Sequence, residues 1–534
     1  MNRGKECVNI IGAGLAGISA ALHLAEAGRY CRIFASQEPE RAQSNLAEGG
    51  INACLNVMGE DDHVSGHFQD TMKGGCDLAD PNMVAGLCLG APDVIRKLQE
   101  YGVPFQRENG RLIQRNFGGQ KKKRTAYVKS STGKMLMAAL IDALRRYECE
   151  GLVERYMHHD FCGLMIREKQ CRGVFIQDRY NREYESFSGP VIMACGGMNG
   201  LFSGNTTGST ANTGNAAAIL FSQGVEMGNL EMIQYHPTTI RIPGKRLLIS
   251  EAARGEGGRL FYYTENMQKY YFLEEKYGAS GNLMPRDVIS REMALSGKEI
   301  FLDLTGLPEQ TWKKKLNDLR EELIHYLAID PVRDVVSVSP GIHFFMGGIR
   351  IDEEHRTNIE GLFAAGECAC GYHGANRLGG NSLLAAIYGG DLAARSVSQY
   401  RFETEQRTVT VTEGIEMAAV QKDTEGRICE ILSSALGVLR TTEGMKKGLE
   451  NILKLQTDCG AEYAMSVMHL RLAEAILRSG LARKESRGAH SIRDHAEKRE
   501  EYRKICVAML KEDQVMIRFE ELPGLRDEFA ELLV

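Results

Sequence analysis

Four short stretches of this chain combine glycine with side chains that could bind an organic anion. They occupy residues 234–238, 250–258, 343–348 and 373–384, and they contain histidine, hydroxyl, carboxylate and arginine groups. In the last stretch, Arg377 precedes a Gly-Gly turn whose backbone could approach a flat cofactor. Because an arginine fork can hold a carboxylate by two hydrogen bonds, the four stretches together predict an anion-binding active site beside a flavin.

A small dicarboxylate has two charged ends, and a water-poor site for it needs strong donors at both. The expected donors are His236, Ser250, His343 and Arg377. Hydride transfer to one carbon of a double bond also requires a proton donor for the neighbouring carbon. Arg286 is the candidate, although a pKa above about 12 makes arginine a reluctant acid. Glu251 and Arg254 are the candidates for a relay that returns its proton.

Each of these residues has an ordinary structural interpretation when it is taken alone. Arg286 beside Asp287 would more often form a structural ion pair. A single histidine is more often a hydrogen-bonded core residue. The functional interpretation is favoured because four glycine-flanked clusters occur in one chain.

A strand, a glycine-rich turn and a helix are predicted near the N-terminus. Residues 8–11 form a β-rich run, residues 12–17 read Gly-Ala-Gly-Leu-Ala-Gly, and residues 18–27 have helical apolar periodicity. Such glycines allow a tight turn, close approach to a pyrophosphate and close helix–strand packing. A second strand is expected at residues 32–35, and Ser36 stands near the place of the usual ribose-binding carboxylate.

Two later stretches predict buried strands that end at small residues. Residues 190–197 and 361–367 both run from apolar side chains into alanine and glycine. Strand ends of this kind suit contact with a dinucleotide, so Gly196 and Gly197 are expected at the cofactor. The aromatic-rich segment between these strands, residues 241–340, is interpreted as an inserted capping domain.

Helical periodicity dominates after about residue 400. Apolar positions at helical spacing in residues 417–439, 443–455 and 463–477 predict a helical bundle. A short charged segment, residues 497–534, follows, and residues 514–519 within it could form a strand. The basic run at residues 121–124 is interpreted as a solvated loop.

Composition argues against several classes of function. The 534 residues are 43% hydrophobic and 25% charged, as in soluble proteins with about two to four domains. A net charge of −5 gives no reason to propose nucleic acid as a partner. The fourteen cysteines include no CxxC pair, so no metal, haem or iron–sulfur site is expected. The sequence shows no evident secretory or twin-arginine signal and no apolar run of about 18 residues. The expected location is therefore the cytoplasm, without insertion into a membrane. Peripheral docking on a membrane complex stays open.

With these motifs, the chain resembles the flavoprotein subunits of the fumarate reductase and succinate dehydrogenase family, especially the Gram-positive succinate dehydrogenase branch. The resemblance extends from the glycine turn to Arg-Lys-Glu-Ser-Arg-Gly-Ala-His at residues 483–490. It implies an α/β fold (α+β overall) with a Rossmann-like FAD-binding domain. The implied domains are the FAD-binding domain at 1–240 and 341–400, the capping domain at 241–340, the helical domain at 401–496 and a C-terminal segment at 497–534.

The resemblance also implies a role for each site residue. Dicarboxylate contacts are implied at His236, Ser250, His343 and Arg377. Arg286 would be the proton donor, with Glu251 and Arg254 as its relay. The implied FAD contacts are Gly12, Ala13, Gly14, Ala16, Gly17, Ser44, Gly49, Gly50, Glu367, Ser382 and Leu383.

One departure from the family concerns the attachment of the flavin. Respiratory members carry a histidine bonded covalently to the flavin just before the motif that corresponds to residues 44–51, whereas this chain has Gln43 there. A carboxamide cannot make that bond, so the FAD is expected to be noncovalent. In the family, loss of the link lowers the flavin potential and disfavours succinate oxidation, so the expected direction is reduction of fumarate.

Two alternative functions remain open at this stage. L-aspartate oxidases share the framework but carry a glutamate before the Gly-Gly pair that matches residues 118–119, where this chain has Phe117. A phenyl ring packs over substrate carbons and binds an ammonium only weakly, which favours fumarate or another unsaturated acid. Alternatively, the chain is mainly an electron-transfer subunit whose partner, an iron–sulfur protein or another electron donor, determines its role.

Overall fold

The computed structural model describes residues 7–401 and 420–533. Its centre is a parallel sheet of five strands in the order β21-β12-β1-β2-β8. These strands are β1 (Cys7–Ile11), β2 (Tyr30–Ala35), β8 (Val153–Met157), β12 (Val191–Met193) and β21 (Leu362–Ala364). Ile10 of β1 pairs with Ile33 on one side and with Ile192 on the other. The run of apolar residues in β1 is typical of a parallel strand covered on both faces, and the predicted α/β class is confirmed.

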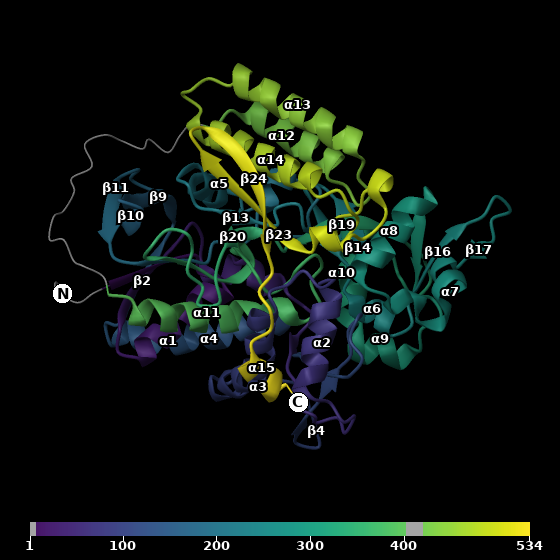
Figure 1. Ribbon diagram of the computed structural model, residues 1–534. Coiled ribbons are helices and arrows are strands. Elements are labelled where there is room, and N and C mark those ends of the chain that lie inside the picture. The colour runs from purple at the N-terminus through teal and green to yellow at the C-terminus, as the bar shows by residue number, and fades with distance from the viewer. Residues whose placement is uncertain (1–6, 402–419, 534) are drawn as a thin grey trace.

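Helices and a small sheet cover this central sheet. Helix α1 (Leu15–Glu26) follows the glycine turn and packs beside α11 (Asn381–Gln399) and α4 (Thr132–Cys149) (Figure 1). The antiparallel strands β9 (His159–Arg167), β10 (Gln170–Asp178) and β11 (Tyr184–Ser188) form a separate sheet that contacts β2 and β12. The turn before α1 and the N-terminus of α11 therefore lie beside the carboxyl ends of the strands.

Two long strands connect this core to a second unit. Strands β14 (Ile233–Ile242) and β19 (Val336–Phe345) pair antiparallel within a six-stranded sheet in the order β15-β14-β19-β18-β16-β17. The other strands are β15 (Lys245–Leu248), β16 (Arg259–Tyr263), β17 (Lys269–Tyr270) and β18 (Ile300–Asp303). The helices of this unit are α6 (Glu251–Gly255), α7 (Phe272–Tyr277), α8 (Arg286–Ser296), α9 (Glu309–Lys315) and α10 (Asn317–Leu327). A separate hydrophobic cluster within residues 240–338 forms its core.

Helices that follow residue 420 form the upper layer of Figure 1. They are α12 (Lys422–Ala435), α13 (Thr442–Asp458) and α14 (Ala464–Ala482). The periodicity at residues 417–439 begins at positions outside the described residues, and its described part contains α12. Buried residues such as Leu432 and Leu470 belong to the same hydrophobic cluster as the central sheet. The helices therefore share one core with the central sheet.

The C-terminal segment completes a sheet that begins much earlier in the chain. Strands β23 (Lys504–Lys511) and β24 (Gln514–Glu521) extend β13 (Met227–Gly228), β20 (Gly348–Arg350) and β22 (Ala369–Cys370). The strand predicted at residues 514–519 is confirmed by β24. Helix α15 (Asp527–Leu532) then packs against α3 (Pro81–Glu100). Within the described ranges, no helix is both long enough and apolar enough to span a membrane.

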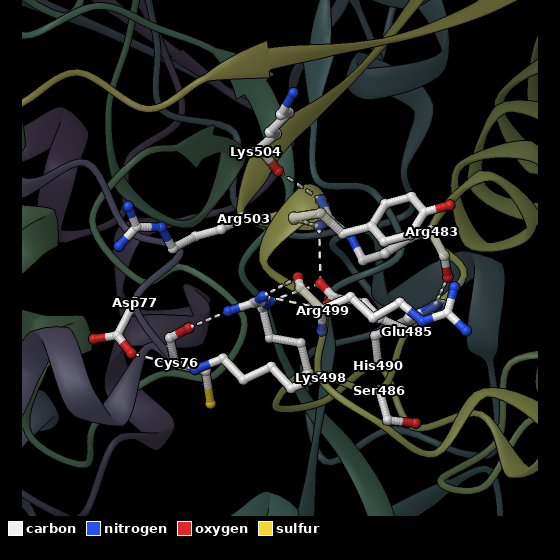
Figure 2. Close-up of polar contacts among 12 residues, drawn as sticks. Cys76, Asp77, Arg483, Glu485, Ser486, His490, Lys498, Arg499, Arg503 and Lys504 are labelled. Carbon is white, nitrogen blue, oxygen red and sulfur yellow. Dashed lines mark hydrogen bonds and ion pairs between the residues drawn. The ribbon is translucent and has the colours of Figure 1, made fainter.

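Buried ion pairs hold this segment in place (Figure 2). Arg483 Nε lies 2.6 Å from Glu231 Oε1, and Arg483 also donates to the backbone carbonyls of Tyr502 and Lys504. The Arg487 and Glu485 side chains form a second buried pair at 2.6 Å. Figure 2 shows Glu485 inside the cluster, while Lys498 pairs with Asp77 at its edge. The motif at residues 483–490 thus joins the helical layer, the C-terminal strands and the core.

Candidate active site

A cavity of about 580 Å³ lies at the carboxyl ends of the parallel strands. Its volume is within the range of about 300–1,000 Å³ that is usual for small-molecule and cofactor sites, and open α/β sheets commonly bind ligands at this edge. Gly12 lines it after β1, Ser36 after β2 and Gly196 after β12. His236 and His343, on the long strands β14 and β19, line its other end. One cavity therefore reaches from the glycine turn to the predicted substrate residues.

The glycine turn is shaped for close approach of a ligand. Gly12 has φ of 117°, and a Cβ there would lie 2.1 Å from the Ala194 carbonyl oxygen of the neighbouring strand end. Helix α1 begins after Gly14 and α11 begins after Gly380, and neither glycine offers a side chain to cap its helix. Free N–H groups at a helix N-terminus bind phosphate or other anions. The cavity wall therefore fits a dinucleotide cofactor whose pyrophosphate faces α1.

The structure brings most of the predicted cofactor residues together. Those that line the cavity are Gly12, Ala13, Gly14, Ala16, Ser36, Ser44, Gly49, Gly50, Gly196, Gly197, Glu367, Ser382 and Leu383. Gly17 lies outside it. A Cβ on Gly17 would lie 1.9 Å from the Gly12 carbonyl oxygen, so this glycine allows α1 to pack closely on the turn. Ser44 Oγ accepts a hydrogen bond from the Leu15 N–H at 3.1 Å, which fixes the loop beside the start of α1.

Sequence reasoning missed one wall of the cavity. Residues 209–217 line it opposite the loop that carries Gln43, and the backbone N–H of Ser209 donates to Gln43 Oε1. Thr207, just before this wall, contacts His343 Nδ1 through its hydroxyl at 2.8 Å. The concentration of glycine, threonine and asparagine in residues 204–215 is the signal that could have identified this wall.

The two predicted histidines lie against each other. The rings of His236 and His343 are 5.3 Å apart between centroids, and their planes are inclined at 63° to each other. Burial, followed by the positive charge of Arg286, holds the pKa of both rings well below the usual value. Both imidazoles are therefore neutral at pH 7, and each can donate one N–H to an anion without adding charge.

Arg286, Glu251 and Arg254 form a buried row. Arg286 Nε donates to Glu251 Oε1 at 2.7 Å, and Arg254 Nη2 lies 3.6 Å from the same oxygen. Burial alone would raise the Glu251 pKa, but the two arginines outweigh it and lower the pKa below 4.5. Burial lowers the pKa of Arg254 to about 10. Arg286 and Glu251 line the cavity, whereas Arg254 lies outside its lining.

The ordinary interpretation of Arg286 as the partner of Asp287 is wrong. Arg286 pairs with Glu251, and Asp287 Oδ1 instead accepts a hydrogen bond from Asn376 Nδ2 at 3.0 Å. The guanidinium is 35 residues away from its carboxylate partner in sequence. Helix α8 packs against β14 and β19, and this tertiary packing brings Arg286 to the carboxylate at the start of α6.

Arg377 adds a second guanidinium to the wall at this end of the cavity. Its Cζ lies 4.4 Å from the centroid of the Phe344 ring, and burial followed by the charge of Arg286 lowers its pKa well below 12.5. Within residues 7–401 and 420–533, neither Arg377 Nε nor Glu251 Oε2 has a hydrogen-bond partner. Together with Arg254 beside Glu251, these arginines outnumber the carboxylates, so this end attracts an anion.

Ser250 and Phe117 complete the lining of this end. Ser250 is the N-cap residue of α6, directly before Glu251. The Phe117 ring packs on two glycines, since a Cβ on Gly49 would lie 3.1 Å from it and one on Gly379 would lie 3.3 Å away. Phe117 therefore presents an apolar surface to the cavity. Glu367 lies deeper, where burial raises its pKa to about 7.

Comparison with known proteins agrees with this geometry. The FAD binding domain family matches residues 8–383, and the fumarate reductase flavoprotein C-term family matches residues 426–524. The succinate dehydrogenase flavoprotein subunit of Bacillus subtilis (strain 168) is 37% identical over 93% of this chain and 92% of its own length. L-aspartate oxidase 2 of Ralstonia nicotianae is 33% identical over 92% of each chain.

A solved structure shows the same fold over nearly the whole chain. The FrdA chain of E. coli quinol fumarate reductase superimposes with a TM-score of 0.88, at 27% identity and 97% coverage of both chains. The predicted resemblance and the predicted FAD-binding domain are both confirmed. This chain belongs to the succinate dehydrogenase and fumarate reductase family of flavoprotein oxidoreductases, which act on the CH–CH bond of succinate or fumarate.

Proposed function

We propose that this chain is a fumarate reductase flavoprotein that works mainly in the reductive direction. The observation that carries the proposal is the charge of the cavity end. Buried Arg286 and Arg377 line it with ionised Glu251 and two neutral histidines, and buried Arg254 lies beside Glu251. The resulting excess of positive charge matches a dianion such as fumarate.

Each residue has a distinct part in this mechanism. Arg377, His236, His343 and the Ser250 hydroxyl bind the two carboxylates and orient the double bond. FAD, when bound and reduced, would supply a hydride to one carbon of that bond. Arg286 donates a proton to the other carbon, and the contact of 2.7 Å with Glu251 supports a return path for a proton through Glu251 and Arg254. Phe117 packs over the substrate and excludes water.

We further propose that FAD is bound without a covalent link. Gln43 lines the cavity at the position of the flavin-linking histidine of respiratory relatives, and its carboxamide accepts from the Ser209 N–H. The two uncapped helix N-termini and the glycine turn hold the cofactor instead. The lower potential expected for an unlinked flavin supports the reductive direction.

The electron donor is proposed to be a separate protein or molecule. The Bacillus subtilis relative is named as a subunit, which supports assembly with an iron–sulfur partner. Another electron donor would serve the same chemistry.

L-aspartate oxidase is the second candidate, because the Ralstonia nicotianae relative covers as much of the chain. An amino acid substrate brings an ammonium group that needs an acceptor in the site. Phe117 offers only its ring face to such a group. Reductase activity on another unsaturated acid is the remaining variant of the proposal.

Anaerobic flavin spectroscopy tests these alternatives. The dithionite-reduced protein is mixed with fumarate or with buffer, and the flavin absorbance is followed. Rapid re-oxidation by fumarate and not by buffer, slowed to a small residual rate in Arg286→Ala, is the expected result. The oxidised protein is also mixed with L-aspartate. Bleaching by L-aspartate, without re-oxidation by fumarate, would assign the chain to the amino acid oxidases.

A further inference from the structure

Gln234 lies on β14, two residues before His236, and it is only 1% exposed. Its Oε1 accepts from Arg286 Nη1 at 3.0 Å. Its Nε2 donates to Asn376 Oδ1 at 2.7 Å and to the Arg377 carbonyl at 2.8 Å. A guanidinium can only donate and a carbonyl can only accept, so the orientation of the carboxamide is determined by its partners.

This carboxamide joins three parts of the chain that are distant in sequence. Gln234 belongs to β14, Arg286 begins α8, and Arg377 lies in the loop before α11. Asn376 extends the connection, because its Nδ2 donates to Asp287 Oδ1 at 3.0 Å. The first turn of α8 is therefore tied to the loop of Arg377 through both Arg286 and Asp287.

The contacts of Arg286 limit which of its N–H groups can face the substrate. Its Nε donates to Glu251 and its Nη1 donates to Gln234. Since Arg286 lines the cavity, the two N–H groups of Nη2 and the second N–H of Nη1 remain as donors that can face the substrate carbon. The acceptor at Nη1 is neutral. A second carboxylate at that position would stabilise the guanidinium cation and make it a weaker acid.

We propose that Gln234 is a positioning residue for proton transfer, which holds Arg286 and Arg377 at a set separation through an uncharged acceptor. The proposal rests on the proposed role of Arg286 as proton donor. Displacement of a catalytic group by about 1 Å can cost about 100-fold in rate. A glutamine is needed because it alone combines a neutral acceptor with two donors at this length.

Three variants test the proposal with reduced, FAD-loaded protein re-oxidised by fumarate. Gln234→Glu keeps the shape, adds a charge and replaces the Nε2 donor by an acceptor. Gln234→Met removes all of these hydrogen bonds. Gln223→Met is the matched control, because the Gln223 carboxamide makes two hydrogen bonds with the Leu164 backbone and lies outside the cavity lining. For each variant, kcat, KM, Tm and malonate affinity are measured.

Both Gln234 variants should lower kcat about 100-fold, with a smaller effect on malonate affinity, while Gln223→Met keeps wild-type kcat. The Gln234→Glu rate should recover toward wild type at low pH, because the protonated carboxyl group is again neutral. In an Arg286→Ala background, Gln234→Met should cause almost no further loss of the residual rate, since it acts through Arg286.

A kcat within threefold of wild type in Gln234→Glu, an equal loss in Gln223→Met, or full additivity with Arg286→Ala would each overturn the proposal. If neither Gln234 variant folds, the residue is structural and the proposal also fails. Failure of the wild-type protein to react with fumarate would instead refute the proposed function.

Discussion

Replacement of Arg377 by methionine should remove most of the affinity for a dicarboxylate. The side chain is 3% exposed, and its Nε has no hydrogen-bond partner among the described residues. A guanidinium about 4 Å from a carboxylate contributes about 4 kcal/mol at an effective dielectric constant of about 20. Loss of that energy corresponds to a dissociation constant about 1,000-fold higher.

The assay uses the oxidised, FAD-loaded protein. Malonate is titrated in, and the change in flavin absorbance gives the dissociation constant without any turnover. Arg377→Lys keeps the charge but loses the fork, so its affinity should fall between wild type and Arg377→Met. The affinity of the wild type should fall with added salt less steeply than that of an exposed site, because the charges are buried.

Arg246→Met is the matched control for loss of a buried arginine. Arg246 is 6% exposed, bonds to Asn205, Thr239 and Ser339, and does not line the cavity. Its replacement should lower Tm and leave the malonate affinity unchanged. A loss of less than tenfold in Arg377→Met, or the same loss in Arg246→Met, would refute the assignment of Arg377 to the substrate.

Two further predictions concern the cofactor side of the cavity. Denaturation in acid should release all the FAD into an ultrafiltrate, because Gln43 offers no covalent link; flavin fluorescence retained by the unfolded chain would contradict this. Burial raises the Glu367 pKa from 4.5 to about 7, so the fold favours the protonated form. The stabilisation of the folded state by protonated Glu367 is present below pH 4.5 and is lost as the pH rises through about 7. The loss is about 3 kcal/mol. Glu367→Gln should abolish this part of the pH dependence of the free energy of unfolding, measured with urea. If that free energy still changes with the same slope between about pH 5 and pH 8, Glu367 is not the source of the pH dependence.

Local sequence patterns predicted the helices and strands whose positions depend on residues close together in the sequence. The β-rich run, the glycine turn and the helical periodicity place β1 (Cys7–Ile11) and α1 (Leu15–Glu26) within a few residues of their observed bounds. The two later C-terminal helices likewise overlap α13 and α14. These features depend on backbone geometry and on the spacing of apolar residues within one helix or strand. That information is present in residues that are close together in the sequence.

Local patterns failed where the partner of a side chain is distant in sequence. The basic run at residues 121–124 was interpreted as a solvated loop, yet Arg124 is fully buried. Its guanidinium pairs with Asp62 at 2.8 Å and with Asp70 at 2.7 Å. These two carboxylates offset the cost of burying the Arg124 guanidinium, and nothing in its own sequence neighbourhood indicates them.

The sequence by itself determined the α/β class, the family and the kinds of chemical group available to the site. Only the tertiary structure decided which atoms meet: Arg286 with Glu251 instead of Asp287, Gln43 with Ser209, and Gln234 between two arginine residues. The physical reason is that a side chain's pKa and its free donor atoms depend on burial and on neighbours within a few ångströms. Those neighbours come from β14, α8 and the loop before α11, which the folding of the whole chain brings together.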